Sequence, residues 1–166
     1  MKKLFVLLIG IFLLTSGCIT VQSYTKPNFD FSTLKKVVIV KLKAHDELLS
    51  QIVTDHVATG FRKSGFNIIE KEQVKILIDE NHIIQSGVTD ADRDVLSRAG
   101  VDAIISGAIT KRDTWKEKYL FSAKMYNIRT GEVIWSAFAH EIEGNDLNEL
   151  SKAISKSIKI KKRVEE

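Results

Sequence analysis

Hydrophobic residues in this chain form short runs and helical stripes that alternate along the sequence. Lys36–Leu42 (KVVIVKL) is apolar and β-branched through its middle, which is typical of a strand buried on both faces. Phe66–Ile69 (FNII) predicts a second strand. Between them, apolar residues recur at steps of three and four and predict an amphipathic helix: Leu48, Leu49, Ile52, Val53, Val57 and Phe61. This order is a βαβ unit, so we expect parallel strands with a right-handed crossover.

Polar residues and glycines mark where the helices begin and end. Asp46 is placed to cap the first helix, and Lys63 with Gly65 forms a stop signal. Thr89–Asp92 (TDAD) resembles a capping box, with an aspartate in the reciprocal position, and predicts the start of another short helix. We expect that helix to end at Gly100.

Two further helices are predicted by the same criteria. Glu70–Asn81 has an acidic start that suits a helix N-terminus. His82–Val88 (HIIQSGV) follows it as a loop with two exposed or half-buried isoleucines. Asn145 or Asp146 is placed to cap a final helix. The apolar side of this helix is formed by Leu147, Leu150, Ile154 and Ile158.

The second half of the chain is rich in strand patterns. Val101–Thr110 predicts a strand, in which Gly107 indicates a bulge or a close backbone approach. Lys118–Ile128 and Val133–Ile142 predict two more strands, and Arg129–Glu132 predicts the hairpin turn between them. These three strands are expected to form an antiparallel meander. The fold prediction is α/β (α+β), with a single mixed sheet of about five strands and about four helices.

The N-terminus has the pattern of an export signal. Two lysines precede the uncharged run Leu4–Leu14, which is too short for the ~20 residues of a spanning helix. Leu14–Cys18 (LTSGC) resembles a bacterial lipobox, although Thr15 stands where leucine is usual. The resemblance implies cleavage after Gly17 and lipid attachment at Cys18. The alternative is an unpaired thiol at the end of an ordinary secretory signal or membrane anchor.

The sequence therefore divides into three parts. Residues 1–17 are predicted to be a lipoprotein signal peptide, and residues 18–34 a lipidated N-terminus and tether. Ile19–Leu34 contains the only proline, lacks a clear period and ends in a short ordered lead-in at Phe29 and Phe31. Residues 35–162 are the predicted periplasmic domain.

Charge changes this picture little. About 149 residues remain after cleavage, with a net charge near +2, which does not suggest a nucleic-acid partner. Basic residues gather in Lys156–Arg163 (KSIKIKKR), near the end of the chain. This segment is interpreted as a solvated helix face and tail; contact with an anionic surface, such as lipid headgroups or peptidoglycan, is the alternative.

No arrangement of residues typical of catalysis is present in the sequence. The histidines are scattered without a partner at metal-ligand spacing, so neither a metal site nor a cofactor is expected. They are His45, His56, His82 and His140. Trp135 and Tyr126 flank the predicted hairpin. They are predicted to pack in the core, and a recognition face is the alternative.

An ordered set of five segments resembles the CsgG-type lipoproteins, a family that includes the curli secretion lipoprotein. The penicillin-binding-protein activator lipoproteins of the LpoB type have a similar periplasmic domain. The segments are Val37–Val40, Gly65–Val74, Leu77–Asp90, Ala99–Thr110 and Asn127–Ala137. The resemblance implies a fold like the TolB N-terminal domain and the anticodon-binding domains, which agrees with the strand and helix patterns.

The chain departs from the curli secretion lipoprotein where that protein carries long insertions. Those insertions supply two membrane hairpins, whereas Lys111–Lys116 is a short connection here. Lys124 also breaks the alternation in Lys118–Ile128. We therefore expect that this protein is not itself a channel.

The functional hypothesis is a non-enzymatic lipoprotein of the bacterial outer membrane, facing the periplasm. It would be held at the membrane through Cys18 and act as an assembly factor, adaptor or activator by binding another envelope protein. One alternative is a subunit of a homo-oligomeric, curli-like secretion complex. Another is a periplasmic domain that binds a small ligand or glycan.

Overall fold

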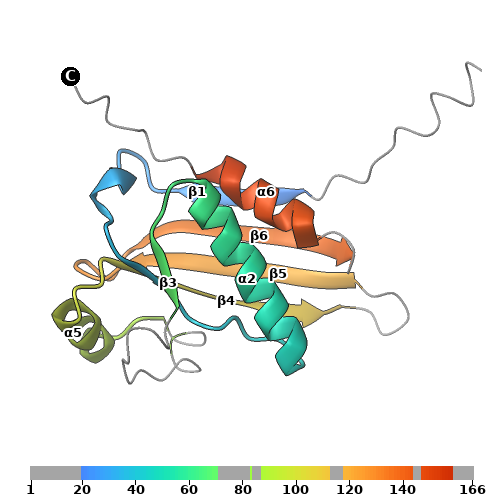
Figure 1. Cartoon of the computed structure of the whole chain (residues 1–166), viewed down its shortest axis with the longest axis horizontal. Coiled ribbons are helices and arrows are strands. Elements are labelled where there is room, and N and C mark those ends of the chain that lie inside the picture. Colours follow the sequence, from blue (N-terminus) through green and yellow to red (C-terminus); the bar gives the residue numbers. More distant parts are fainter. Residues whose placement is uncertain (1–19, 71–82, 84–86, 113–117, 144–146, 159–166) are drawn as a thin grey trace, which may run out of the picture.

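The computed structural model describes residues 20–70, 83, 87–112, 118–143 and 147–158. They form one six-stranded sheet with the strand order β1-β6-β5-β4-β2-β3, together with three α-helices (Figure 1). The strands are β1 Val21–Thr25, β2 Val37–Ile39, β3 Ile68–Glu70, β4 Ala103–Lys111, β5 Lys118–Asn127 and β6 Val133–Glu143. The helices are the 3₁₀ turn η1 Phe31–Thr33 and the α-helices α2 Glu47–Lys63, α5 Asp90–Arg98 and α6 Leu147–Ser157. The predicted mixed fold is confirmed.

The directions of the strands follow the prediction. β2 lies parallel to β3, as expected for the βαβ unit, and it also pairs in parallel with β4. β4, β5 and β6 form the expected antiparallel meander. The helix predicted over Glu70–Asn81 lies outside the described residues except for Glu70, which ends β3. Within the described parts of the chain, no helix is long and apolar enough to cross a bilayer.

The sixth strand corrects the predicted tether. Val21–Thr25 is β1, which pairs antiparallel with β6 along its whole length. The assignment of residues 18–34 to a tether is therefore wrong for this strand. Its sequence shows little strand signal because four of its five side chains are exposed and only Val21 packs against the core. The predicted lead-in after it is confirmed, since Phe31 is buried and its ring lies 4.8 Å from that of Phe29.

Local signals placed the helix ends correctly. The Asp46 side chain caps α2 by accepting a hydrogen bond from the backbone N–H of Leu49 at 2.7 Å. Gly65 follows the end of α2 with a φ of 98°. Thr89 and Asp92 form the capping box of α5. The cap predicted at residues 145 and 146 lies outside the described part of the chain.

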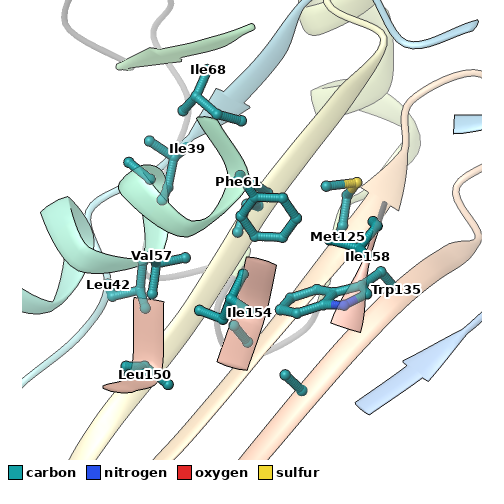
Figure 2. Close-up of a cluster of buried hydrophobic side chains, with 14 of the residues drawn as sticks. Ile39, Leu42, Val57, Phe61, Ile68, Met125, Trp135, Leu150, Ile154 and Ile158 are labelled. Atoms are coloured by element: carbon teal, nitrogen blue, oxygen red, sulfur yellow. The ribbon is translucent and has the colours of Figure 1, made fainter. Parts of the chain in front are cut away.

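The main core lies between one face of the sheet and helices α2 and α6. These two helices lie side by side across the strands (Figure 1). Trp135 of β6 belongs to this core, with Phe61 of α2 and Ile154 of α6 close to it (Figure 2). All three side chains are fully buried. The apolar stripes predicted on the two helices therefore face the sheet.

A second, smaller core lies on the opposite face of the sheet. There, Leu96 of α5 packs with Val38 of β2, Ile104 of β4 and Ile83. Ile83 is completely buried, so the expectation of an exposed or half-buried side chain at this position is wrong. Local sequence cannot show this contact, because the partners of Ile83 come from distant parts of the chain.

The predicted close approach at Gly107 is confirmed. A Cβ atom built on Gly107 would lie 2.3 Å from the backbone oxygen of Ser122 and 2.9 Å from the Cα of Ala123 on β5. On its other side, the Gly107 carbonyl accepts a hydrogen bond from the Lys43 N–H at 3.0 Å. The glycine is therefore held between two chain segments.

Candidate functional site

Part of the sheet face opposite α2 and α6 is exposed along β1, β5 and β6. Alternation along these strands places the larger apolar residues toward the main core and a mixed set on the other side. We call this set the open face, and each of its side chains is exposed or half-buried. Its residues are Gln22, Tyr24, Leu120, Ser122, Lys124, Ser136, Phe138 and His140.

Strand register arranges most of the open face in two rows that cross three strands. Residues directly opposite each other on neighbouring strands have Cβ atoms about 4.5–5.5 Å apart, so each row is a continuous strip. The rows are Ser122–Phe138–Gln22 and Lys124–Ser136–Tyr24. Residues from three distant parts of the sequence thus form one surface.

The open face combines aromatic rings with a single charge. The Tyr24 side chain is 50% exposed. The rings of Phe138 and His140 pack edge to face, with their centroids 4.3 Å apart. Lys124 is exposed and has no ion-pair partner among the described residues. None of the eight side chains is a carboxylate. Exposed aromatic residues with few charges are typical of the centre of a protein–protein interface.

The residues singled out from sequence fall in three different places. Cys18 lies outside the described residues. Trp135 is fully buried, and its indole Nε1–H donates to the Ser157 Oγ at 3.1 Å, which confirms the core interpretation. Tyr126 is half-buried against the second core, where burial raises the pKa of its hydroxyl. Neither aromatic residue belongs to the open face.

The histidines also separate. His45 stacks on Tyr119 with ring centroids 6.3 Å apart, His56 is half-buried on α2, and His82 lies outside the described residues. Among the described side chains, no group of three or more His, Cys, Asp or Glu is placed to hold a metal ion. Only His140 lies on the open face. The sequence analysis did not place His140 on an exposed face of the sheet. The alternation of Trp135, Ala137 and Ala139 with their neighbours could have indicated it.

A pocket of about 470 Å³ lies where β4 begins, beside η1 and the turn between β5 and β6. Its floor includes the buried side chains of Leu34 and Ile128. On its wall, the Asp102 carboxylate accepts hydrogen bonds from the backbone N–H groups of Lys35 at 2.8 Å and Lys36 at 2.9 Å. Asp102 therefore has a structural role, because it connects the segment before β2 to the start of β4.

No protein-family model and no curated protein matches this chain. Similar solved structures include a DUF4136 family protein from Bacteroides thetaiotaomicron, with a TM-score of 0.50 and 9% identity over 84% of this chain and 94% of that one. The PelC dodecamer from Paraburkholderia phytofirmans has a TM-score of 0.48 and 14% identity over 84% and 94% of the two chains. The LpoB C-terminal domain from Escherichia coli has a TM-score of 0.46 and 14% identity over 69% and 88%.

These similarities concern the fold alone. LpoB-type lipoproteins were named in the resemblance drawn from the sequence, and none of these three structures is described as a CsgG-type protein. The chain therefore shares its fold with the DUF4136 family protein, and its resemblance to the LpoB-type and curli secretion lipoproteins stays a prediction.

Proposed function

We propose that this chain is a non-enzymatic, lipid-anchored protein of the bacterial envelope that binds another protein through the open face. In this role it acts as an assembly factor, adaptor or activator at the outer membrane, on the periplasmic side. The observation that carries the proposal is the open face itself, where exposed Tyr24 and the Phe138–His140 pair share one surface with Lys124, which has no ion-pair partner among the described residues.

The chemistry of the open face defines the partner. Aromatic rings at the surface gain most when apolar side chains cover them, because that contact removes apolar area from water. Lys124 is the one charged residue among the eight that define the face, and none of the eight is a carboxylate. The matching surface on the partner is therefore an apolar patch with an acidic residue at its edge.

The chain offers a matched pair of variants to test the open face. Tyr24 and Leu48 are the two exposed large hydrophobic residues in the described part of the chain, at 50% and 71% exposure, and Leu48 lies on α2, away from the open face. We expect Tyr24→Ala to weaken partner binding by about 2 kcal/mol, or roughly thirtyfold, as at an interface hot spot. Leu48→Ala is the control and should bind like the wild type.

The measurement is quantitative capture of envelope proteins by the three lipidated full-length chains. A protein retained by the wild type and Leu48→Ala but lost with Tyr24→Ala is the expected result. Equal retention by all three chains would contradict the assignment of the open face, and so would a selective loss with Leu48→Ala.

The lipid anchor is tested at Cys18. We expect Cys18→Ala to abolish palmitate labelling and to release the protein from the membrane fraction, because several acyl chains are needed for stable anchoring. The activity of the partner system is lost with it, while the circular dichroism spectrum of the domain is unchanged. Full activity of the released protein would contradict a role that requires the membrane.

Particle size separates this proposal from the secretion alternative of the sequence analysis. In detergent, a lipid-anchored adaptor runs as a small species with its partner. A discrete large ring that conducts ions would instead favour a homo-oligomeric secretion complex. Binding of peptidoglycan fragments would favour the glycan-binding alternative, with the pocket beside Asp102 as the place to look.

A further inference from the structure

The distance between the lipid-bearing residue and the sheet is very short. Only Ile19 and Thr20 separate Cys18 from Val21, the first residue of β1. An extended chain spans at most about 3.3–3.6 Å per residue, so Val21 lies within about 11 Å of the Cα of Cys18. The headgroup region of one leaflet is about 5–7 Å thick. With lipid on Cys18, as proposed above, the start of β1 is confined to the membrane surface.

β1 cannot serve as a longer tether, because it is fixed at several points. Five residues pair with β6, from Val21 opposite Ala139 to Thr25 opposite Trp135. Beyond the strand, the Lys26 N–H donates to the Ile134 carbonyl at 2.9 Å. The Lys26 ammonium also forms an ion pair with Glu132 at 2.6 Å, and this contact lowers the pKa of the Glu132 carboxyl. Moving β1 outward would break all of these contacts.

A groove with a basic side lies next to this strand. It has a volume of about 410 Å³ and runs between β1 and α6. Thr20, Val21 and Ser23 form one wall, and Lys152 and Lys156 stand on the other. The two lysines are four residues apart, so they project from the same side of α6, and both are exposed.

The charges of this groove leave a net positive surface. Lys152 forms an ion pair with Glu149 at 2.5 Å, and Glu149 is the one carboxylate among the described residues that line the groove. Lys156 has no ion-pair partner within the described parts of the chain. A lysine ammonium is a compact donor that binds phosphate groups as a point charge.

We propose that the β1–α6 groove rests on the anionic phospholipid headgroups of the bilayer that holds Cys18, with Lys152 and Lys156 contacting their phosphates. The inference rests on lipidation of Cys18 and goes beyond it, since an anchor alone does not fix which side of a domain faces the membrane. The domain then stands on the β1 edge of its sheet, and α5, which packs near β2 and β4, lies toward the far edge.

The geometry gives a test with two label positions. Lipid occupies the only cysteine of the chain, so an introduced cysteine is a unique attachment site for a fluorophore. Ser23 and Ser97 are both exposed serines; Ser23 lies on β1, and Ser97 lies on α5, which packs near β2 and β4. Strands are about 4.8 Å apart, so the two positions differ by about 15–20 Å in height when the β1 edge faces the lipid.

The lipidated full-length variants Ser23→Cys and Ser97→Cys are placed in vesicles of phosphatidylethanolamine and phosphatidylglycerol that carry headgroup nitroxide quenchers. We expect strong quenching of the label at Ser23 and weak quenching at Ser97. Equal quenching at both positions, or stronger quenching at Ser97, would overturn the proposal.

The lysines are tested in the same vesicles. Each lysine near an anionic surface shifts binding by about fivefold, so Lys156→Gln should reduce the docked population about fivefold and weaken quenching at Ser23. Lys111→Gln, at the exposed end of β4, is the matched control and should have no effect. No effect of Lys156→Gln would overturn the lysine–phosphate contact.

Palmitate labelling of the same samples separates the two proposals. A chain that carries palmitate but shows the Ser97 label nearer the lipid keeps the proposed anchor and contradicts the orientation. A chain without palmitate contradicts the anchor, and the orientation with it.

Discussion

Replacing Gly107 with valine should prevent the domain from folding at ordinary temperature. The first atom of the added side chain, Cβ, would lie 2.3 Å from the Ser122 backbone oxygen. That oxygen belongs to β5, which is paired with β4, so it cannot move aside as a side chain could. β4 cannot shift away from β5 to relieve this clash, because the Lys43 N–H donates a hydrogen bond to the Gly107 carbonyl on the other side. Overpacking in a core costs about 1–3 kcal/mol when side chains can move, and a clash with backbone exceeds that range.

The matched control is Thr110→Val, which places the same β-branched side chain at an exposed position of the same strand. Soluble yield, circular dichroism and the urea midpoint should separate the two variants, with Thr110→Val close to the wild type. A cooperative urea transition of Gly107→Val near the wild-type midpoint would show that the contact between β4 and β5 is looser than the structure indicates.

Replacing Trp135 with alanine should cost about 3–5 kcal/mol of unfolding free energy. Trp135 is among the largest of the fully buried side chains, and its ring meets Phe61 edge to face at 4.9 Å. Its removal leaves a cavity where the sheet, α2 and α6 meet (Figure 2). A domain of this size typically has about 5–15 kcal/mol of stability, so the variant loses much of its margin.

Two further variants divide this loss into its causes. Trp135→Phe keeps most of the apolar contact and removes the indole N–H, whereas Ser157→Ala keeps the ring and removes its acceptor. We expect a loss of about 1–3 kcal/mol for Ser157→Ala, because a buried donor is left unsatisfied. Urea unfolding followed by circular dichroism measures all three variants. A loss below about 1 kcal/mol for Trp135→Ala would contradict its place in the core.

Elements with strong local signals were predictable from the sequence. The stripe of α2, its cap at Asp46 and the capping box at Thr89 each depend on residues within a few positions of one another. The hairpin turn was equally clear, because Gly131 adopts a φ of 73° that other residues disfavour. In all of these, the residues that determine the structure are neighbours in sequence.

β1 was missed for the opposite reason. Its five residues, VQSYT, have only one side chain against the core, so no apolar alternation is visible. The strand forms because β6 offers a row of unpaired backbone groups at the edge of the sheet, more than a hundred positions later in the sequence. A single sequence read locally does not contain that information.

The open face was missed because it depends on where the helices pack. The alternation of β6 separates Ser136, Phe138 and His140 from the core side of the strand. It does not show that α2 and α6 both cover the opposite face, which leaves these side chains uncovered by either helix. Exposure at these positions is a property of the whole arrangement.

The pairing of β1 with β6 also has a mechanical consequence. With the proposed lipid on Cys18, tension between the membrane and the domain would enter through Val21, the first paired residue of β1. A force along β1 acts on all of the β1–β6 residue pairs at once. A force perpendicular to the strand separates the pairs one after another. For the proposed anchored domain, the direction of the force would therefore decide whether β1 stays paired with β6 or separates from it.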